Sequence, residues 1–228
     1  MGIERILVVV AHPDDESFIC GGTIAKYAKQ GAEVTVVSAT KGELGRRVGQ
    51  SPYLSREALR GVRERELREA CQAIGVQRLE FLDILDKTVE FEDELRLKDR
   101  IAGLIQEIKP DVLLTFHEVL GGHPDHLAIG KAATRAYQEA VDRGQGEAKH
   151  LYFITFGEEI KSFSIPSEQI TAVDIRDSLQ EKLLTYRAHR TQTDIVEWVW
   201  QSDERAIQSI HPTEYFIRGG GEDVLGAL

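Results

Sequence analysis

Cysteine is nearly absent from this sequence, and long apolar runs are missing. Two cysteines in 228 residues are too few for a disulfide framework, which favours a reducing compartment such as the cytoplasm. Cys20 and Cys71 are therefore predicted to be small, buried apolar side chains. No apolar run approaches the roughly 18 residues of a membrane-spanning helix, and the early Glu4 does not fit a secretory signal.

Positive charge is also in deficit. Asp and Glu number 38 against 28 Lys and Arg, which gives a formal net charge of −10. Nucleic acids and anionic membranes bind clustered positive charge, so neither is an expected partner of this chain.

Short apolar runs alternate with amphipathic segments along most of the chain, and this alternation predicts buried strands separated by helices. The predicted strands cover 6–11, 33–40, 79–84, 111–117 and 151–156, with an edge strand at 170–175. The predicted helices cover 21–30, 56–74, 92–108, 126–143 and 177–189, whereas 197–201 and 213–218 are ambiguous. We expect an α/β fold: a Rossmann-like, mostly parallel sheet with helices on both faces. One domain is expected over 1–228, with a less regular C-terminal extension.

Polar residues gather directly after two of the predicted strands. The segment AHPDDE (11–16) follows the first strand, and GGHPDH (121–126) comes shortly after the fourth. Doubly wound sheets bind ligands outside the carboxyl ends of their strands, at the point where the strand order reverses. The two segments are therefore expected to converge, provided that the first and fourth strands are neighbours.

Together the two segments offer the donor set of a catalytic metal site. Zinc favours imidazole and carboxylate ligands, with three protein ligands and one open position, and iron(II) accepts a similar set. His12, Asp15 and His126 are the predicted ligands, although the spacing alone does not separate Asp15 from Asp14. A single His-Pro-Asp segment is also common turn chemistry, so the prediction depends on both segments.

The remaining polar residues of the two segments suit hydrolysis of an amide. Asp14 is the expected general base, and His123 is expected to stabilise the developing oxyanion or to act as an acid. Asp125 is expected to orient His123 and to raise its pKa. A bound metal lowers the pKa of a water molecule from 15.7 to about 7, and the leaving amine takes a proton from one of the two acids.

The two motifs resemble those of the PIG-L/LmbE-like zinc-dependent N-acetylglucosaminyl deacetylases, and the likeness covers roughly residues 5–218. The resemblance implies His12, Asp15 and His126 as zinc ligands and Asp14 as the base. It also implies that His123 is the oxyanion stabiliser or acid, and that Asp125 orients this histidine. Members often form trimers or hexamers, so a homo-oligomer is expected.

Other segments extend the resemblance to the substrate side. KGE (41–43) resembles a turn that borders the sugar, which implies a role for Glu43, and the helix after it implies that Arg63 faces the substrate. LDILDK (82–87) occupies the position of a Leu-Gly-x-Pro-Asp-Gly pattern, without its Pro and Gly, and implies a role for Asp86. KLLTYRAHRTQ (182–192) implies that His189 lies near the site, where a buried structural role is the alternative.

The segments 41–59 and 85–93 resemble a narrower branch of the family, which removes acetyl from N-acetylglucosaminyl malate in bacillithiol biosynthesis. The implied substrate is an anionic N-acetyl amino sugar. Arg46 and Arg47, in a long polar loop over 41–55, are therefore candidates to meet its malate carboxylates.

Three alternatives remain at the level of the sequence. The same site could serve a deacylase of another N-acyl sugar or small-molecule amide conjugate. A metal-free relative that only binds a sugar is a second alternative, although all six site positions hold competent residues. A dinucleotide-dependent oxidoreductase shares the fold class, but no G-x-G-x-x-G pattern follows the first strand.

Overall fold

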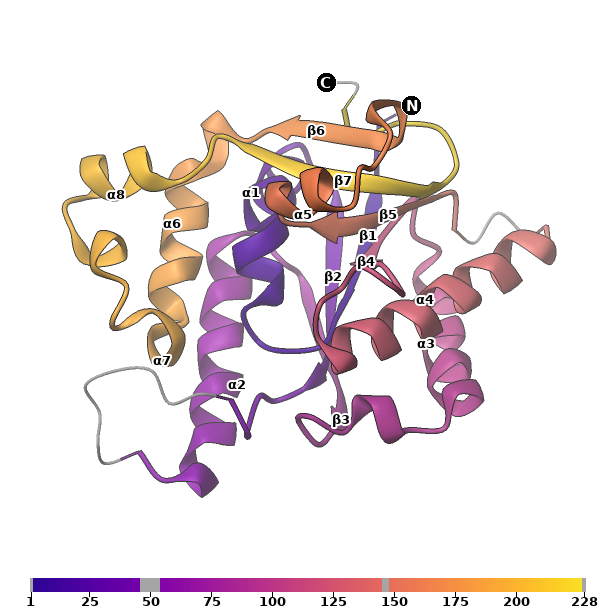
Figure 1. Ribbon diagram of the computed structural model, residues 1–228, viewed down its shortest axis with the longest axis horizontal. Coiled ribbons are helices and arrows are strands. Elements are labelled where there is room, and N and C mark those ends of the chain that lie inside the picture. The colour runs from indigo at the N-terminus through magenta and orange to yellow at the C-terminus, as the bar shows by residue number, and fades with distance from the viewer. Residues whose placement is uncertain (1, 46–53, 145–147, 227–228) are drawn as a thin grey trace.

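A seven-stranded sheet organises the part of the chain that the computed structural model describes, residues 2–45, 54–144 and 148–226 (Figure 1). The strand order is β3-β2-β1-β4-β5-β7-β6. The first five strands pair in parallel, whereas β7 pairs antiparallel with both β5 and β6. The strands are β1 (Arg5–Val10), β2 (Glu33–Thr40), β3 (Arg78–Ile84), β4 (Val112–Phe116), β5 (His150–Thr155), β6 (Ile170–Asp174) and β7 (Thr213–Gly220).

Helices cover both faces of this sheet. In Figure 1, α1, α2 and α6 lie on one face, and α3 and α4 lie on the other. The helices are α1 (Asp15–Lys29), α2 (Arg56–Ala73), α3 (Glu94–Ile108), α4 (Pro124–Asp142), α5 (Gly157–Ser162), α6 (Leu179–Ala188), α7 (Arg190–Thr193) and α8 (Asp203–Ser209). None of the helices within the described ranges has the length and apolar character needed to cross a membrane.

The predicted fold class is confirmed, including the mostly parallel sheet. The apolar run of β1 is buried between the two helical layers, as continuous apolar strands of parallel sheets are. Cys20 and Cys71 are free and buried, as expected. The C-terminal part carries the short helices α7 and α8, yet it also completes the sheet through β6 and β7.

One predicted boundary needs correction, and the structure assigns two segments that were ambiguous. The helix expected at 21–30 begins at Asp15, because two acidic residues in its first turn complement the positive end of the helix dipole. The ambiguous segment 213–218 belongs to β7, which lies between β5 and β6, whereas Glu197–Trp200 forms a 3₁₀ turn. The helix start was missed because the apolar periodicity begins only after the first turn of α1. The strand was ambiguous because the local sequence does not show that a late segment will pair antiparallel between two other strands.

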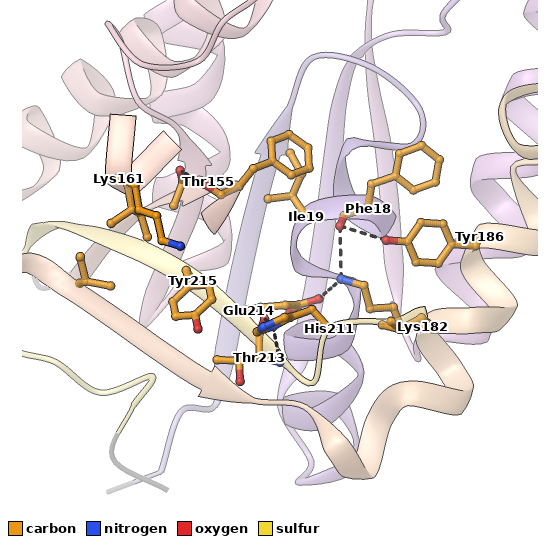
Figure 2. A pocket seen from close by; sticks show the side chains of 14 residues that line it. Phe18, Ile19, Thr155, Lys161, Lys182, Tyr186, His211, Thr213, Glu214 and Tyr215 are labelled. Carbon is orange, nitrogen blue, oxygen red and sulfur yellow. Dashed lines mark hydrogen bonds and ion pairs between the residues drawn. The ribbon is translucent and has the colours of Figure 1, made fainter. Parts of the chain in front are cut away.

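A buried ion pair fixes the middle of α1 to β7 and α6. Lys182 donates to Glu214 and also to the carbonyl oxygen of Phe18, at 3.2 Å. The Glu214 carboxylate accepts the backbone N–H groups of Gly22 and Thr23, at 2.9 and 2.7 Å. Figure 2 shows the pair at a cavity of about 670 Å³ between α1, α6 and β7. The pair therefore determines where α1, and with it the segment before α1, lies on the sheet.

Replacing Lys182 by Met is expected to lower the free energy of unfolding by about 3–5 kcal/mol, because it leaves the buried Glu214 charge without its counter-charge. Urea unfolding of the purified protein measures this loss. Lys29→Met is the matched control, since the Lys29–Glu181 pair is partly exposed and contributes at most about 1 kcal/mol. Equal losses in the two variants would contradict the role given to the buried pair.

Candidate active site

The two polar segments meet at the carboxyl ends of β1 and β4, as expected. These strands are adjacent and parallel, and the strand order reverses between them, because β2 and β3 extend the sheet from β1 whereas β5 extends it from β4. His12 follows β1 directly, and His126 lies in the first turn of α4. Their rings come within hydrogen-bond distance, with 3.2 Å between His12 Nδ1 and His126 Nε2.

A tight turn places the first segment. Pro13 and Asp14 occupy the two central positions between His12 and Asp15, and the Asp15 N–H lies 3.4 Å from the His12 carbonyl oxygen. Asp14 has φ 119° and ψ −26°, in the region that a type II turn requires of its third residue and that glycine usually fills. An aspartate at this glycine-like position indicates that its carboxylate is needed for something other than the turn.

The three predicted metal ligands converge on one point. His12 Nδ1 lies 3.6 Å from Asp15 Oδ2, and His126 Nε2 lies 3.3 Å from Asp15 Oδ1. With the 3.2 Å between the two ring nitrogens, these separations match tetrahedral zinc, whose ligand atoms at bonds of about 2.0–2.2 Å stand roughly 3.4 Å apart. The residues present therefore fit a bound metal ion.

Other groupings of the same side chains are also close. Ligand atoms of His12, His123 and His126 lie within 4.8 Å of one another, as do those of His12, Asp86 and Asp125. The second of these groups pairs His12 Nε2 with the carboxylates of Asp86 and Asp125. The set of His12, Asp15 and His126 fits a metal better, because it leaves His12 Nε2 free to donate to an outer carboxylate.

Two outer carboxylates flank His12. Its Nε2 lies 3.1 Å from Asp125 Oδ2 and 3.3 Å from Asp86 Oδ1. Burial by itself lowers the pKa of His12, but hydrogen bonds to Asp125, Asp15 and Asp86 outweigh it and raise that pKa to about 12. Such a concentration of negative charge around one imidazole is electrostatically suited to a bound cation.

The role expected for Asp125 needs correction. Its carboxylate bonds to His12 and accepts the backbone N–H groups of Lys87 and Val89, at 2.8 and 3.1 Å. The contact with His123 runs instead through the Asp125 backbone N–H, which donates to His123 Nδ1 at 3.1 Å. Asp125 therefore orients His12 rather than His123. Sequence spacing placed Asp125 next to His123, whereas the helix start turns its side chain toward β1.

Replacing Asp125 by Asn is expected to weaken zinc affinity about 10–100-fold, because the outer partner of a metal-bound histidine fixes its orientation and raises its basicity. Competition with a chelating dye measures the affinity. The exposed Asp203, which pairs with Arg187, offers a control, since Asp203→Asn leaves the site untouched. Unchanged zinc binding by the Asp125 variant would show that Asp125 does not support His12 as a metal ligand.

His123 caps the N-terminus of α4 through Nδ1. Because this nitrogen accepts a hydrogen bond, the ring proton of the neutral form sits on Nε2. Burial and the neighbouring charges of His12 and His126 lower the pKa of His123. A neutral ring with its N–H on the open side suits hydrogen bonding to an oxyanion, which is one of the two roles expected for His123.

Asp14 is held by Arg63. The guanidinium Nη2 donates to Asp14 Oδ2 at 2.9 Å and to the Pro13 carbonyl, while Nη1 donates to the Gly42 carbonyl at 3.0 Å. Burial raises the pKa of Asp14 to about 6, even though Arg63 opposes the increase. A carboxyl group with this pKa is poised near neutrality to take up and release a proton.

Arg63 was expected to face the substrate, but it is 3% exposed and clamps the turn that carries Asp14. The Arg63 side chain therefore does not lie on a solvated face of α2. Gly42 and Gly45 make room for the guanidinium, since a Cβ on either would lie 2.1 or 2.5 Å from its Nη1. The Gly-rich turn after β2 therefore provides the space that the Arg63 guanidinium occupies.

Two other residues that were predicted to bind the substrate, Glu43 and Asp86, lie around this centre. Glu43 is buried and its Oε2 has no partner in the described structure, while Asp86 accepts the Leu44 N–H at 2.9 Å. Lys87, which stands at the glycine of the family pattern, takes φ 65°, a conformation that favours glycine. Arg46 and Arg47 lie outside the described residues.

His189 is fully buried beneath the turn, and its Nε2 bonds to Glu16 Oε1 at 2.8 Å. Glu16 is 0% exposed, so it is not a solvated acid of the first helical turn. Its importance was missed, as was that of the Lys182–Glu214 pair. Both contacts join residues more than 30 positions apart, and only an unusually acidic first turn hinted at one of them.

The fold and this histidine–carboxylate centre define an α/β protein of the metal-dependent hydrolase type. A family model described as GlcNAc-PI de-N-acetylase (PIG-L) matches residues 7–137. The chain is also 37% identical over 190 residues to the probable N-acetyl-α-D-glucosaminyl L-malate deacetylase 2 of Bacillus cereus, which covers 83% of this chain and 84% of that protein. The chain therefore belongs to the PIG-L family.

Solved structures support the fold. The N,N'-diacetylchitobiose deacetylase of Pyrococcus horikoshii superposes with a TM-score of 0.70 at 22% identity, covering 95% of this chain and 84% of that one. The 4-carboxy-2-hydroxymuconate hydratase GalB of Pseudomonas putida superposes with a TM-score of 0.71 at 21% identity, over 95% of each chain. Because a hydratase shares the architecture, the fold alone does not determine the activity, which depends on the residues of the site.

Proposed function

We propose that the protein is a metal-dependent N-deacetylase that removes acetyl from an N-acetylglucosaminyl conjugate, with N-acetylglucosaminyl malate as its substrate. One observation carries the proposal: the two polar segments bring three candidate ligands together, with the partly buried carboxyl group of Asp14 beside them. The relative in Bacillus cereus, named for this malate conjugate, supports the substrate.

His12, Asp15 and His126 would hold the metal, which we propose to be zinc, with iron(II) as the alternative ion. When bound, the ion supplies Lewis acidity and lowers the pKa of a water molecule. The outer carboxylates Asp125 and Asp86 hold the His12 ring through its Nε2, at 3.1 and 3.3 Å, so that Nδ1 faces the other two ligands.

Asp14 is the proposed proton carrier of the reaction. It takes a proton from the attacking water as the new carbon–oxygen bond forms. It then delivers that proton to the amine nitrogen as the carbon–nitrogen bond breaks, which leaves acetate and a free amine. Arg63 keeps the carboxylate in place during both transfers, through its 2.9 Å contact. A pKa of about 6 lets one group perform both steps near neutral pH.

His123 is the proposed hydrogen-bond donor to the carbonyl oxygen. Its Nδ1 is engaged by the start of α4, so Nε2–H is the free donor. Because the ring is fixed before the substrate arrives, it stabilises the negative charge that develops on this oxygen without reorganisation, a contribution of about 2.7–4 kcal/mol for one donor in other acyl transfers.

On the substrate side, Glu43 and Asp86 border the centre and are proposed to meet the sugar. Arg46 and Arg47 are proposed to meet the malate carboxylates. The domain extent over 1–228, a cytoplasmic location and assembly into a trimer or hexamer remain predictions.

Amine release from zinc-loaded protein tests the proposal, with N-acetylglucosaminyl malate and plain N-acetylglucosamine offered in parallel. The malate conjugate is expected to be cleaved much faster, and Arg46→Ala/Arg47→Ala is expected to raise KM for this conjugate alone. An equal effect on both sugars would show that the two arginines do not bind the malate carboxylates. If the metal-loaded protein cleaves neither sugar, its substrate is another N-acyl conjugate.

A further inference from the structure

Asp14 combines an unfavourable backbone conformation with a carboxylate that is held by Arg63. Its φ of 119° lies where only glycine is at ease, and it precedes α1 without capping the helix through its side chain. A residue keeps such a conformation only when surrounding contacts enforce it. Arg63 holds the carboxylate, but the backbone of Asp14 needs a separate restraint.

Glu16 provides that restraint. Its Oε2 accepts the Asp14 backbone N–H at 3.0 Å, and its Oε1 accepts from the Ser17 hydroxyl and lies 2.8 Å from His189 Nε2. Both oxygens are thus engaged, and the side chain is 0% exposed. The Glu16 carboxylate therefore accepts the backbone N–H of the N-cap residue, as the acidic residue of a capping box does.

His189 holds Glu16 from the far side. It lies between α6 and α7, is fully buried, and its Nδ1 has no hydrogen-bond partner in the described structure. The hydrogen bond to Glu16 is therefore its main polar contact. Glu66 on α2 anchors the same segment, since it accepts both the N–H and the hydroxyl of Thr191, at 2.7 and 2.6 Å.

We propose that Glu16 and His189 form a positioning pair that locks the backbone of Asp14, so that its carboxylate faces the reacting centre. The kinetic part of this inference rests on the proposed function of Asp14. The pair contributes no atom to the reaction, and it acts through the Asp14 N–H. Helix α2 then controls both ends of Asp14, its carboxylate through Arg63 and its backbone through the His189 segment.

Kinetics of zinc-loaded variants test the proposal. Glu16→Leu and His189→Leu are expected to lower kcat about 100-fold, the effect of misplacing a catalytic group by about 1 Å, with KM and zinc content unchanged. His189→Gln keeps a donor near the Nε2 position and is expected to restore most of kcat. Thr185→Val, a buried change on α6 that does not touch Glu16, is the control and is expected to retain kcat.

An unchanged kcat in the Leu variants overturns the proposal, and so does a loss that follows loss of zinc or is not restored by His189→Gln. A second measurement needs no substrate, so it remains decisive even if the proposed function fails. Asp14→Gly should relieve the strained backbone of residue 14. It also removes the contact with Arg63, and it does so equally in the intact protein and in Glu16→Leu.

If Glu16 enforces the strain, glycine at position 14 gains more in the intact protein than in Glu16→Leu, where the turn has already relaxed. The gain in Tm from Asp14→Gly is expected to be about 2–4 °C larger in the intact background. Equal gains in the two backgrounds would show that Glu16 does not hold the backbone, and would overturn the positioning role.

Discussion

Asp14→Asn is expected to lower kcat about 10²–10⁴-fold while the protein still binds zinc, because the amide cannot accept a proton in the transition state. The substitution keeps the shape of the side chain and its contact with Arg63, so the turn should persist. Stopped amine-release assays and metal analysis measure both quantities on the same sample.

The pH dependence follows from the same group. Asp14 must be deprotonated to accept a proton, and its pKa of about 6 lies above the usual range because it is buried. The value of kcat/KM is therefore expected to fall as the pH drops below about 6, and to lose this acid limb in Asp14→Asn. An identical acid limb in the variant would assign the ionisation to another group.

Metal removal is the second change with a large expected effect. A chelator is expected to reduce amine release at pH 7 by about 10³-fold or more, because neutral water with a pKa of 15.7 replaces a nucleophile of pKa about 7. Zinc or iron(II) should restore it. His126→Ala is expected to show the same loss without restoration, because one of three ligands is then missing.

The control for the ligand variant is His211→Ala. His211 is exposed, and among the described residues its ring hydrogen-bonds to Thr213 of the same turn, so its loss should change neither metal content nor rate. Full activity of the chelated protein would mean that the histidine–carboxylate centre serves another purpose than hydrolysis.

The sheet and the convergence of the two polar segments could be predicted because both depend on local patterns. Apolar runs identify the parallel strands, and the rule for strand ends brings His12 near His126. Side-chain direction is a different matter. Asp125 turns toward β1 and Arg63 turns inward to Asp14, and these choices follow from helix starts and from the space left by Gly42.

The contacts that hold α1 could not be predicted, for a related reason. Glu16 and Glu214 find partners 173 and 32 positions away along the chain, His189 and Lys182 respectively. Nothing in the local sequence distinguishes such a buried acid from a solvated one. Their burial is determined only when α6 and β7 pack on α1.

The anchoring of α1 by Glu214 has a consequence for synthesis on the ribosome. Asp14 and its neighbours are made about 200 residues before Glu214, whose carboxylate accepts the Gly22 and Thr23 amides. At about 5–20 residues per second, the nascent protein would wait roughly 10–40 s between the two. During that interval the active-site turn would lack its final support, so the finished centre would assemble only after Glu214 has been made.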